Sequence, residues 1–207
     1  MANLLDLFEQ QMDGGLLEQL GSQVGISDPN KTKTAAKGAF SVLMGALQKN
    51  ASTDQGASIL SSVLDKDHDG SILDDVMGYV TGAMQPKNTR TVDGAGILSH
   101  LLSGTNHDNI LSQVASMAGI DKNSSASLLM KLAPIAMGML GKMKKENNLD
   151  ENGLRDVLTQ TVEPAKKDNM LGGLLGSFLD QDGDGSVMDD LGRMGMKAIF
   201  KGIFGGK

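Results

Sequence analysis

The feature that most constrains this chain is an internal repeat. Near Gly25 the sequence reads Val-Gly-Ile-Ser and, after a polar stretch, becomes apolar over residues 40–49. About 94 residues later, near Gly119, it reads Ala-Gly-Ile-Asp and again leads to an apolar stretch, over residues 133–142. A repeat on this scale indicates two copies of one multihelical unit.

Each copy is followed by an acidic loop, residues 65–75 in the first and 180–190 in the second. The loops lie 115 residues apart, so roughly 20 residues are inserted before the second loop, around residues 149–169. A polar joint that contains proline separates the copies, as linkers do. It divides the chain into a first helical repeat, residues 1–85, and a second, residues 86–207.

Within both repeats the apolar residues recur at spacings of three and four, which is typical of amphipathic helices. Ser27 and Asp121 are expected N-caps. The segment Leu128–Met143 is apolar nearly all round and is expected to be a core helix, with Pro134 kinking or ending it. No sustained alternation with β-branched residues is present. The sequence therefore predicts an all-α, internally duplicated multihelical array.

Glycine is unusually frequent for a helical protein, at 27 residues. Gly45, Gly138 and Gly141 lie in the apolar segments, and we expect them to let neighbouring helices approach closely. The alternative is a plain loss of helix stability, of about 1 kcal/mol per glycine.

Composition excludes several classes of protein. The net charge of −6 argues against a general nucleic-acid-binding surface. The absence of Cys excludes disulfides, thiolate catalysis and thiolate metal sites. Aromatic residues make up only 3%, so the core must be aliphatic and is expected to include Met130, Met137 and Met139. The N-terminus lacks the pattern of a secretory signal, and a cytoplasmic location is expected.

Both acidic loops begin like an EF-hand calcium loop, with Asp at positions 1, 3 and 5, Gly at 6, Ser at 7 and Ile or Val at 8. Alternate carboxylates bring hard oxygen ligands to one centre, the glycine allows a sharp turn, and the apolar residue anchors the loop. The sequence therefore predicts Ca²⁺ as the cofactor of both repeats. The expected ligands are Asp65, Asp67, Asp69, Ser71 and Asp75 in the first loop, and Asp180, Asp182, Asp184, Ser186 and Asp190 in the second.

The end of each loop departs from the EF-hand pattern. Position 12, normally a bidentate Glu, is Val76 or Leu191, and the carboxylates stand at positions 10 and 11 instead. A shortened loop that closes with Asp75 or Asp190 predicts weak binding, with a Kd of roughly 10⁻⁵ to 10⁻³ M. The alternative is an Asp-rich turn whose last two Asp residues begin the next helix, where the helix dipole favours them.

No pattern of an enzyme is present. The sequence has no His pair of a zinc protease, no phosphate-binding loop with Lys-Ser or Lys-Thr, and no nucleophile elbow. His68 stands at loop position 4, where side chains normally face solvent. His100 is expected to be a partly buried structural residue, and His107 lies in a polar stretch. The chain is therefore expected to be non-catalytic.

The C-terminal segment, residues 188–204, combines a basic stripe of Arg193, Lys197 and Lys201 with apolar bulk. Such a helix can dock on a protein partner or lie on a membrane surface, the membrane being the less favoured. Packing on its own domain is the commoner arrangement.

Three stretches, residues 96–102, 132–138 and 171–176, together resemble the YidB-like bacterial proteins (domain of unknown function 937). The resemblance is closer over residues 94–192 than over residues 14–78, where an Ala-Pro pair is missing. It implies a small all-helical fold, with an arrangement likened to a homeodomain, and no catalytic residues.

These observations favour a non-catalytic, calcium-binding structural or interaction protein, with self-association into a homo-oligomer as an open option. The alternative is a DNA-associated module that uses a homeodomain-like helical motif. The acidic net charge and the lack of a basic recognition helix count against that alternative.

Overall fold

The computed structural model describes residues 3–12, 15–84, 88–103 and 106–179. These residues form ten α-helices and two short 3-10 helices, without a strand, so the all-α fold is confirmed. In chain order the helices are α1 (Leu4–Gln11), α2 (Gly15–Val24), α3 (Pro29–Asn50), α4 (Asp54–Asp67), η1 (Ser71–Asp75), α5 (Val76–Thr81), η2 (Thr89–Val92), α6 (Gly94–Leu101), α7 (His107–Ala118), α8 (Lys122–Asn147), α9 (Glu151–Lys167) and α10 (Leu171–Leu179).

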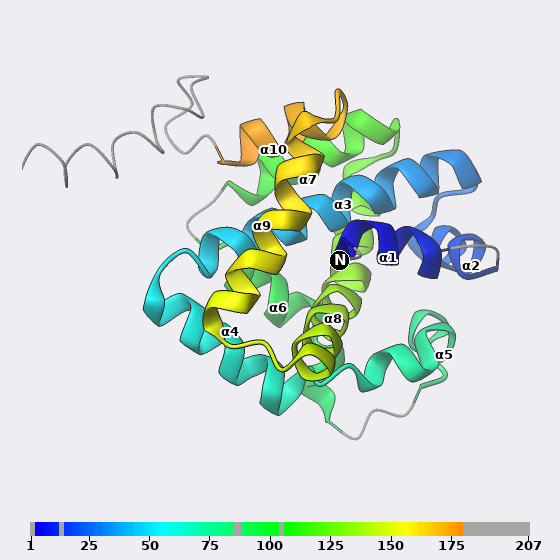
Figure 1. Ribbon diagram of the computed structural model, residues 1–207. Coiled ribbons are helices and arrows are strands. Elements are labelled where there is room, and N and C mark those ends of the chain that lie inside the picture. Colours follow the sequence, from blue (N-terminus) through cyan, green and yellow to red (C-terminus); the bar gives the residue numbers. More distant parts are fainter. Residues whose placement is uncertain (1–2, 13–14, 85–87, 104–105, 180–207) are drawn as a thin grey trace, which may run out of the picture.

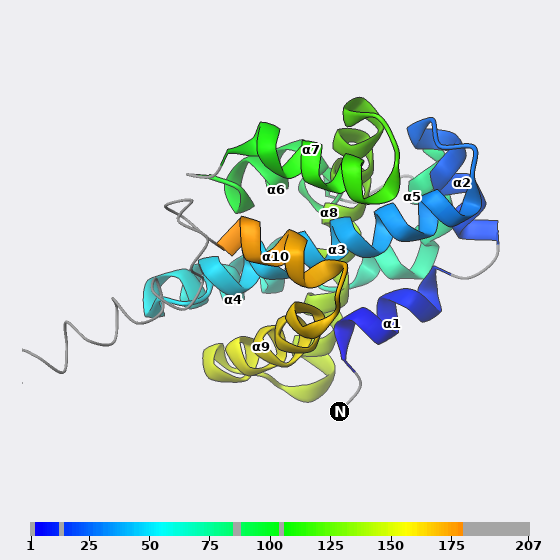
Figure 2. The same cartoon turned by 90° about the horizontal axis from the view of Figure 1, so that it is seen from above.

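The two longest helices, α3 and α8, cross at the centre of the molecule and the shorter helices surround them (Figures 1 and 2). The predicted core helix Leu128–Met143 is the middle of α8. By length and composition α8 could also cross a membrane, but 78% of its most apolar window is buried inside the fold. Its hydrophobicity is therefore accounted for by its place in the core.

The same turn leads into both central helices. Gly25 precedes α3 with φ of 80°, and Gly119 precedes α8 with φ of 63°, a left-handed conformation that favours glycine. Asp121 caps α8 as predicted, accepting hydrogen bonds from two backbone amides. For α3 the predicted cap Ser27 is wrong by one residue: Asp28 is the N-cap, because the helix begins at Pro29.

The two predicted repeats pack on each other's central helix. In the first repeat, α4 and η1 lie against α8, whereas in the second repeat α10 lies against α3. The described helices of both repeats therefore share one hydrophobic core. The inserted residues of the second repeat correspond to α9, which packs on α3 and α4. The duplication and the boundary between the repeats stay predictions.

Pro134 does not end a helix, because α8 continues through it to Asn147. Proline has no backbone N–H, so the carbonyl of Met130 loses its usual partner four residues on. Helix α6 begins against this carbonyl, and a Cβ on Gly94 would collide with Met130 O. Met130 is 38% exposed rather than in the core, whereas Met137 is buried as predicted.

The expected close approach at the helical glycines is confirmed. A Cβ on Gly45 would lie 3.1 Å from Leu175 Cδ2 of α10. A Cβ on Gly138 would collide with Ile72, and one on Gly141 with the carbonyl oxygen of His68. The neighbour of these last two glycines is the acidic loop rather than a helix, so they provide the surface on which the loop is seated.

Candidate functional site

The first acidic loop agrees with its sequence pattern at positions 6 and 8, whereas its positions 1–3 continue α4 and its positions 7–11 form η1. Gly70 at position 6 has φ of 95°, a conformation that a side chain would strain. Ile72 at position 8 is fully buried, and its side chain fills the space above Gly138. Asp65 and Asp67 lie on the last turn of α4, which ends at Asp67. The loop is therefore anchored at one end by a helix and at the other by a buried isoleucine.

The carboxylates at positions 1 and 3 have protein partners from elsewhere in the chain. Asp65 forms an ion pair with Lys144 of α8. Asp67 Oδ1 accepts a hydrogen bond of 2.7 Å from Asn88 Nδ2, and its other oxygen lies 3.9 Å from Arg90 Nη1. Lys144 therefore neutralises Asp65, and Asn88 is the hydrogen-bond partner of Asp67, without a metal ion.

The later carboxylates satisfy backbone amides. Asp69 Oδ1 accepts a hydrogen bond of 3.0 Å from Ser71 N, and the hydrogen bonds of Ser71 lower the pKa of the Asp69 carboxyl. Asp75 Oδ1 accepts one of 2.8 Å from Gly78 N and is the N-cap of α5. Asp75 therefore begins a helix, as the alternative interpretation of the loop expected, and a loop ligand can have this second role.

Among the described residues, no three His, Asp or Glu side chains gather into a group that could hold a metal. Calcium binding by the first loop stays a prediction. The second loop, with its expected ligands Asp180, Asp182, Asp184, Ser186 and Asp190, and the C-terminal segment 188–204 lie outside the described residues.

The histidines differ from expectation. His68 is buried, with 3% of its surface exposed, instead of facing solvent, because the loop backbone is pressed onto α8 at Gly141. Burial lowers the pKa of His68, against the opposing influence of Asp67 and Asp69. Among the residues that the structure describes, none is a hydrogen-bond partner for its Nδ1. His100 is exposed rather than partly buried.

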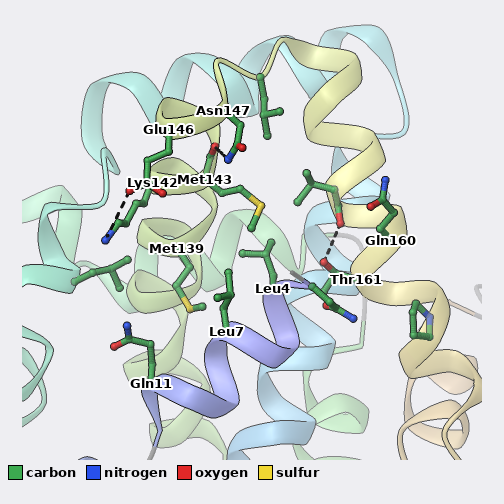
Figure 3. A pocket seen from close by; sticks show the side chains of 15 residues that line it. Leu4, Leu7, Gln11, Met139, Lys142, Met143, Glu146, Asn147, Gln160 and Thr161 are labelled. Carbon is green, nitrogen blue, oxygen red and sulfur yellow. Dashed lines mark hydrogen bonds and ion pairs between the residues drawn. The ribbon is translucent and has the colours of Figure 1, made fainter. Parts of the chain in front are cut away.

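A groove of about 720 Å³ lies between α1, α8 and α9 (Figure 3). The apolar part of its lining includes Leu4 and Leu7 of α1 and Met139 of α8. Amide side chains and an ion pair of 3.9 Å between Lys142 and Glu146 lie along its edges. Among the described residues that line the groove, no nucleophile is paired with a base.

Residues 6–143, about two thirds of the chain, match a protein family described as "Bacterial protein of unknown function (DUF937)". The chain belongs to this family. The DUF937 match begins in α1 and ends in α8, so it includes the first predicted repeat in addition to part of the second, and it stops before residues 171–176. No curated protein and no solved structure matches the chain.

The single tyrosine of the chain, Tyr79 on α5, is 9% exposed. Burial raises the pKa of Tyr79 to about 12, because the phenolate cannot be solvated. A raised pKa means that the neutral phenol stabilises the folded state fully below pH 10. That contribution, about 3 kcal/mol for two pKa units, is lost as the pH rises from 10 towards 12.

We expect a pH titration followed by absorbance at 295 nm to show the phenol ionising well above pH 10. Urea unfolding at pH 9 and at pH 11 should show the lower stability at the higher pH. A midpoint near pH 10, while the far-ultraviolet circular dichroism stays native, would show that Tyr79 is not buried.

Proposed function

We propose that this member of the DUF937 family is a non-catalytic structural or interaction protein whose acidic loops bind Ca²⁺. The observation that carries the proposal is the backbone of the first loop. The left-handed Gly70 supplies the sharp turn of a calcium loop, and the buried Ile72 supplies its anchor. Three Asp residues precede them at alternate positions, which is the spacing that calcium loops use.

Calcium must compete with the protein partners of these carboxylates. Asp65 would have to leave Lys144, and Asp67 would have to leave Asn88, before both could turn towards one centre. The ion pair of Asp65, whose side chain is 62% exposed, is of modest strength, whereas Asp67 is only 19% exposed and its hydrogen bond is partly buried. The exchange therefore costs more at Asp67 than at Asp65. The competition, with the missing Glu at position 12, is a reason for weak affinity, with a Kd of roughly 10⁻⁵ to 10⁻³ M.

The expected role of the ion is to stabilise the fold. Five carboxylates crowd the first loop, and a cation that binds only the folded loop adds stability by mass action. At a calcium concentration one hundred times the Kd, the gain is about 2.7 kcal/mol. We expect such a stabilised scaffold to serve in self-association or in the docking of residues 188–204 on a partner.

Calorimetric titration of the metal-free chain is expected to show about two sites, one per loop. Changing Asp65 and Asp67 to Asn should remove one of them. Lys144→Gln should raise the calcium affinity of the first loop about threefold, because it removes the competing ammonium. Lys122→Gln, at the opposite end of α8, is the matched control and should leave the affinity unchanged.

Two further readouts decide the role of the ion. Calcium should raise the melting temperature and leave the binding of a hydrophobic dye unchanged. A large calcium-dependent rise in dye binding without a change in melting would make the protein a sensor. If the Asp65 and Asp67 double variant bound as much calcium as the parent, the proposed ligands would be wrong.

A further inference from the structure

A second cavity, of about 470 Å³, lies near the start of α8. It lies between α2, α5, the beginning of α6 and α8. Most of its wall is apolar. The apolar lining residues are Val24, Tyr79, Met84, Val92, Ala95 and Met130.

Of the described residues that line this cavity, Lys131 is the one cation. Lys131 is half-buried on α8. Its Nζ donates a hydrogen bond of 3.2 Å to the carbonyl oxygen of Val80, and lies 5.5 Å from the centre of the Tyr79 ring. Within the described residues no carboxylate lies within ion-pair distance of it. A carbonyl and a ring face compensate a partly buried charge less well than an anion does.

The N-terminus of α6 also borders the cavity, although the carboxylate of Asp93 offsets its dipole. Gly94 and Ala95, the first two residues of α6, line the cavity, and the amide dipoles of a helix favour an anion at its N-terminus. The carboxylate of Asp93 is also at this end, but it is engaged as the helix cap, accepting a hydrogen bond of 2.9 Å from Gly96 N. Lys131 therefore remains the group in the cavity that lacks a counter-ion among the described residues.

We propose that this cavity binds a small amphipathic carboxylate. The carboxylate pairs with the ammonium of Lys131, and the apolar body covers the Tyr79 ring and the side chains of Met84 and Met130. This pairing supplies the charge partner that Lys131 lacks and removes the exposed surface of Met130 from water. None of the residues that line this cavity belongs to an acidic loop, so binding to it can be tested without calcium.

Tyr79 provides a local probe, because the chain has one tyrosine and no tryptophan. Octanoate, added in the presence of a calcium chelator, should change the tyrosine fluorescence saturably. Octanol has the same chain length without the charge and should bind at least tenfold more weakly. Calorimetry of the same titration measures binding without relying on the fluorophore.

Lys131→Met should weaken octanoate binding about tenfold or more, while Lys131→Arg should retain it within about threefold, because it keeps the charge. Lys33→Met, an exposed lysine of α3, is the matched control and should bind like the parent. Circular dichroism of each variant verifies the fold. Equal binding of octanoate by the parent and Lys131→Met, equal binding of octanoate and octanol, or no saturable binding in either measurement would overturn the proposal.

Discussion

Replacing Gly141 with Ala is expected to lower the free energy of unfolding by about 2 to 4 kcal/mol. At an ordinary helical position the same change raises stability, by about 1 kcal/mol. Here the new Cβ would collide with the carbonyl oxygen of His68 and lie 2.9 Å from its carbonyl carbon. These are backbone atoms, so no side-chain rotation relieves the clash, and the loop must move away from α8.

Gly173 on α10 is the matched control, because a Cβ there would meet nothing within 4 Å. Gly173→Ala should be neutral or stabilising by up to about 1 kcal/mol. Urea unfolding of the two variants, followed by circular dichroism, measures the difference. A Gly141→Ala variant as stable as the parent would show that the acidic loop is not seated on α8.

Local sequence signals predicted the helices well, because they report local energetics. The spacing of apolar residues gave the core helix now seen as α8, and Asp121 was recognised as its cap. The choice of Ser27 for the other cap was wrong because Pro29 fixes the first helical position one residue later than the spacing suggests. Pro134 was expected to kink or end a helix, and α8 does not end there but continues to Asn147.

The sequence predicted the first loop at Gly70 and Ile72, but not the helical backbone of its other positions or the partners of its carboxylates. The positions of Gly70 and Ile72 follow from spacing within the loop itself, and the structure has them in the expected roles. The ion pair of Asp65 with Lys144 joins residues 79 apart in the chain, and no local pattern predicts it. The burial of His68 likewise depends on α8. Gly138 and Gly141 have no side chains there, so the loop can pack directly on the helix.

The two cavities also depend on long-range packing. The groove needs α1 at the N-terminus and α9 far along the chain to lie beside α8, as Figure 3 shows. The apolar residues of α1 and α9 can be read from the sequence. That they line a groove depends on how α1, α8 and α9 are placed relative to one another. The sequence indicates the cavity beside Lys131 even less clearly. Its one sign is a single lysine inside an apolar run.

Phe40→Ala is expected to lower the free energy of unfolding by about 3 to 5 kcal/mol. Phe40 is completely buried on α3, and its ring stacks on that of Phe8 of α1, with the centroids 4.1 Å apart. Phe40→Leu should lower the free energy of unfolding by less than Phe40→Ala does, because it leaves a smaller cavity.

A double-mutant cycle with Phe8→Ala separates the stack from simple burial. We expect a coupling free energy of about 0.5 to 1.5 kcal/mol between the two rings, measured by urea unfolding. If the effects of the two single variants on the free energy of unfolding simply added up, the stack itself would contribute nothing.

Phe8 also fixes α1 on α3, while Leu4 and Leu7 of the same helix form one wall of the groove. Phe8→Ala should therefore speed hydrogen exchange of the amides in α1 and leave that of α8 slow. Loss of protection in both helices together would show that α1 does not open on its own. Selective loss would show that the groove can lose one wall while the core stays folded.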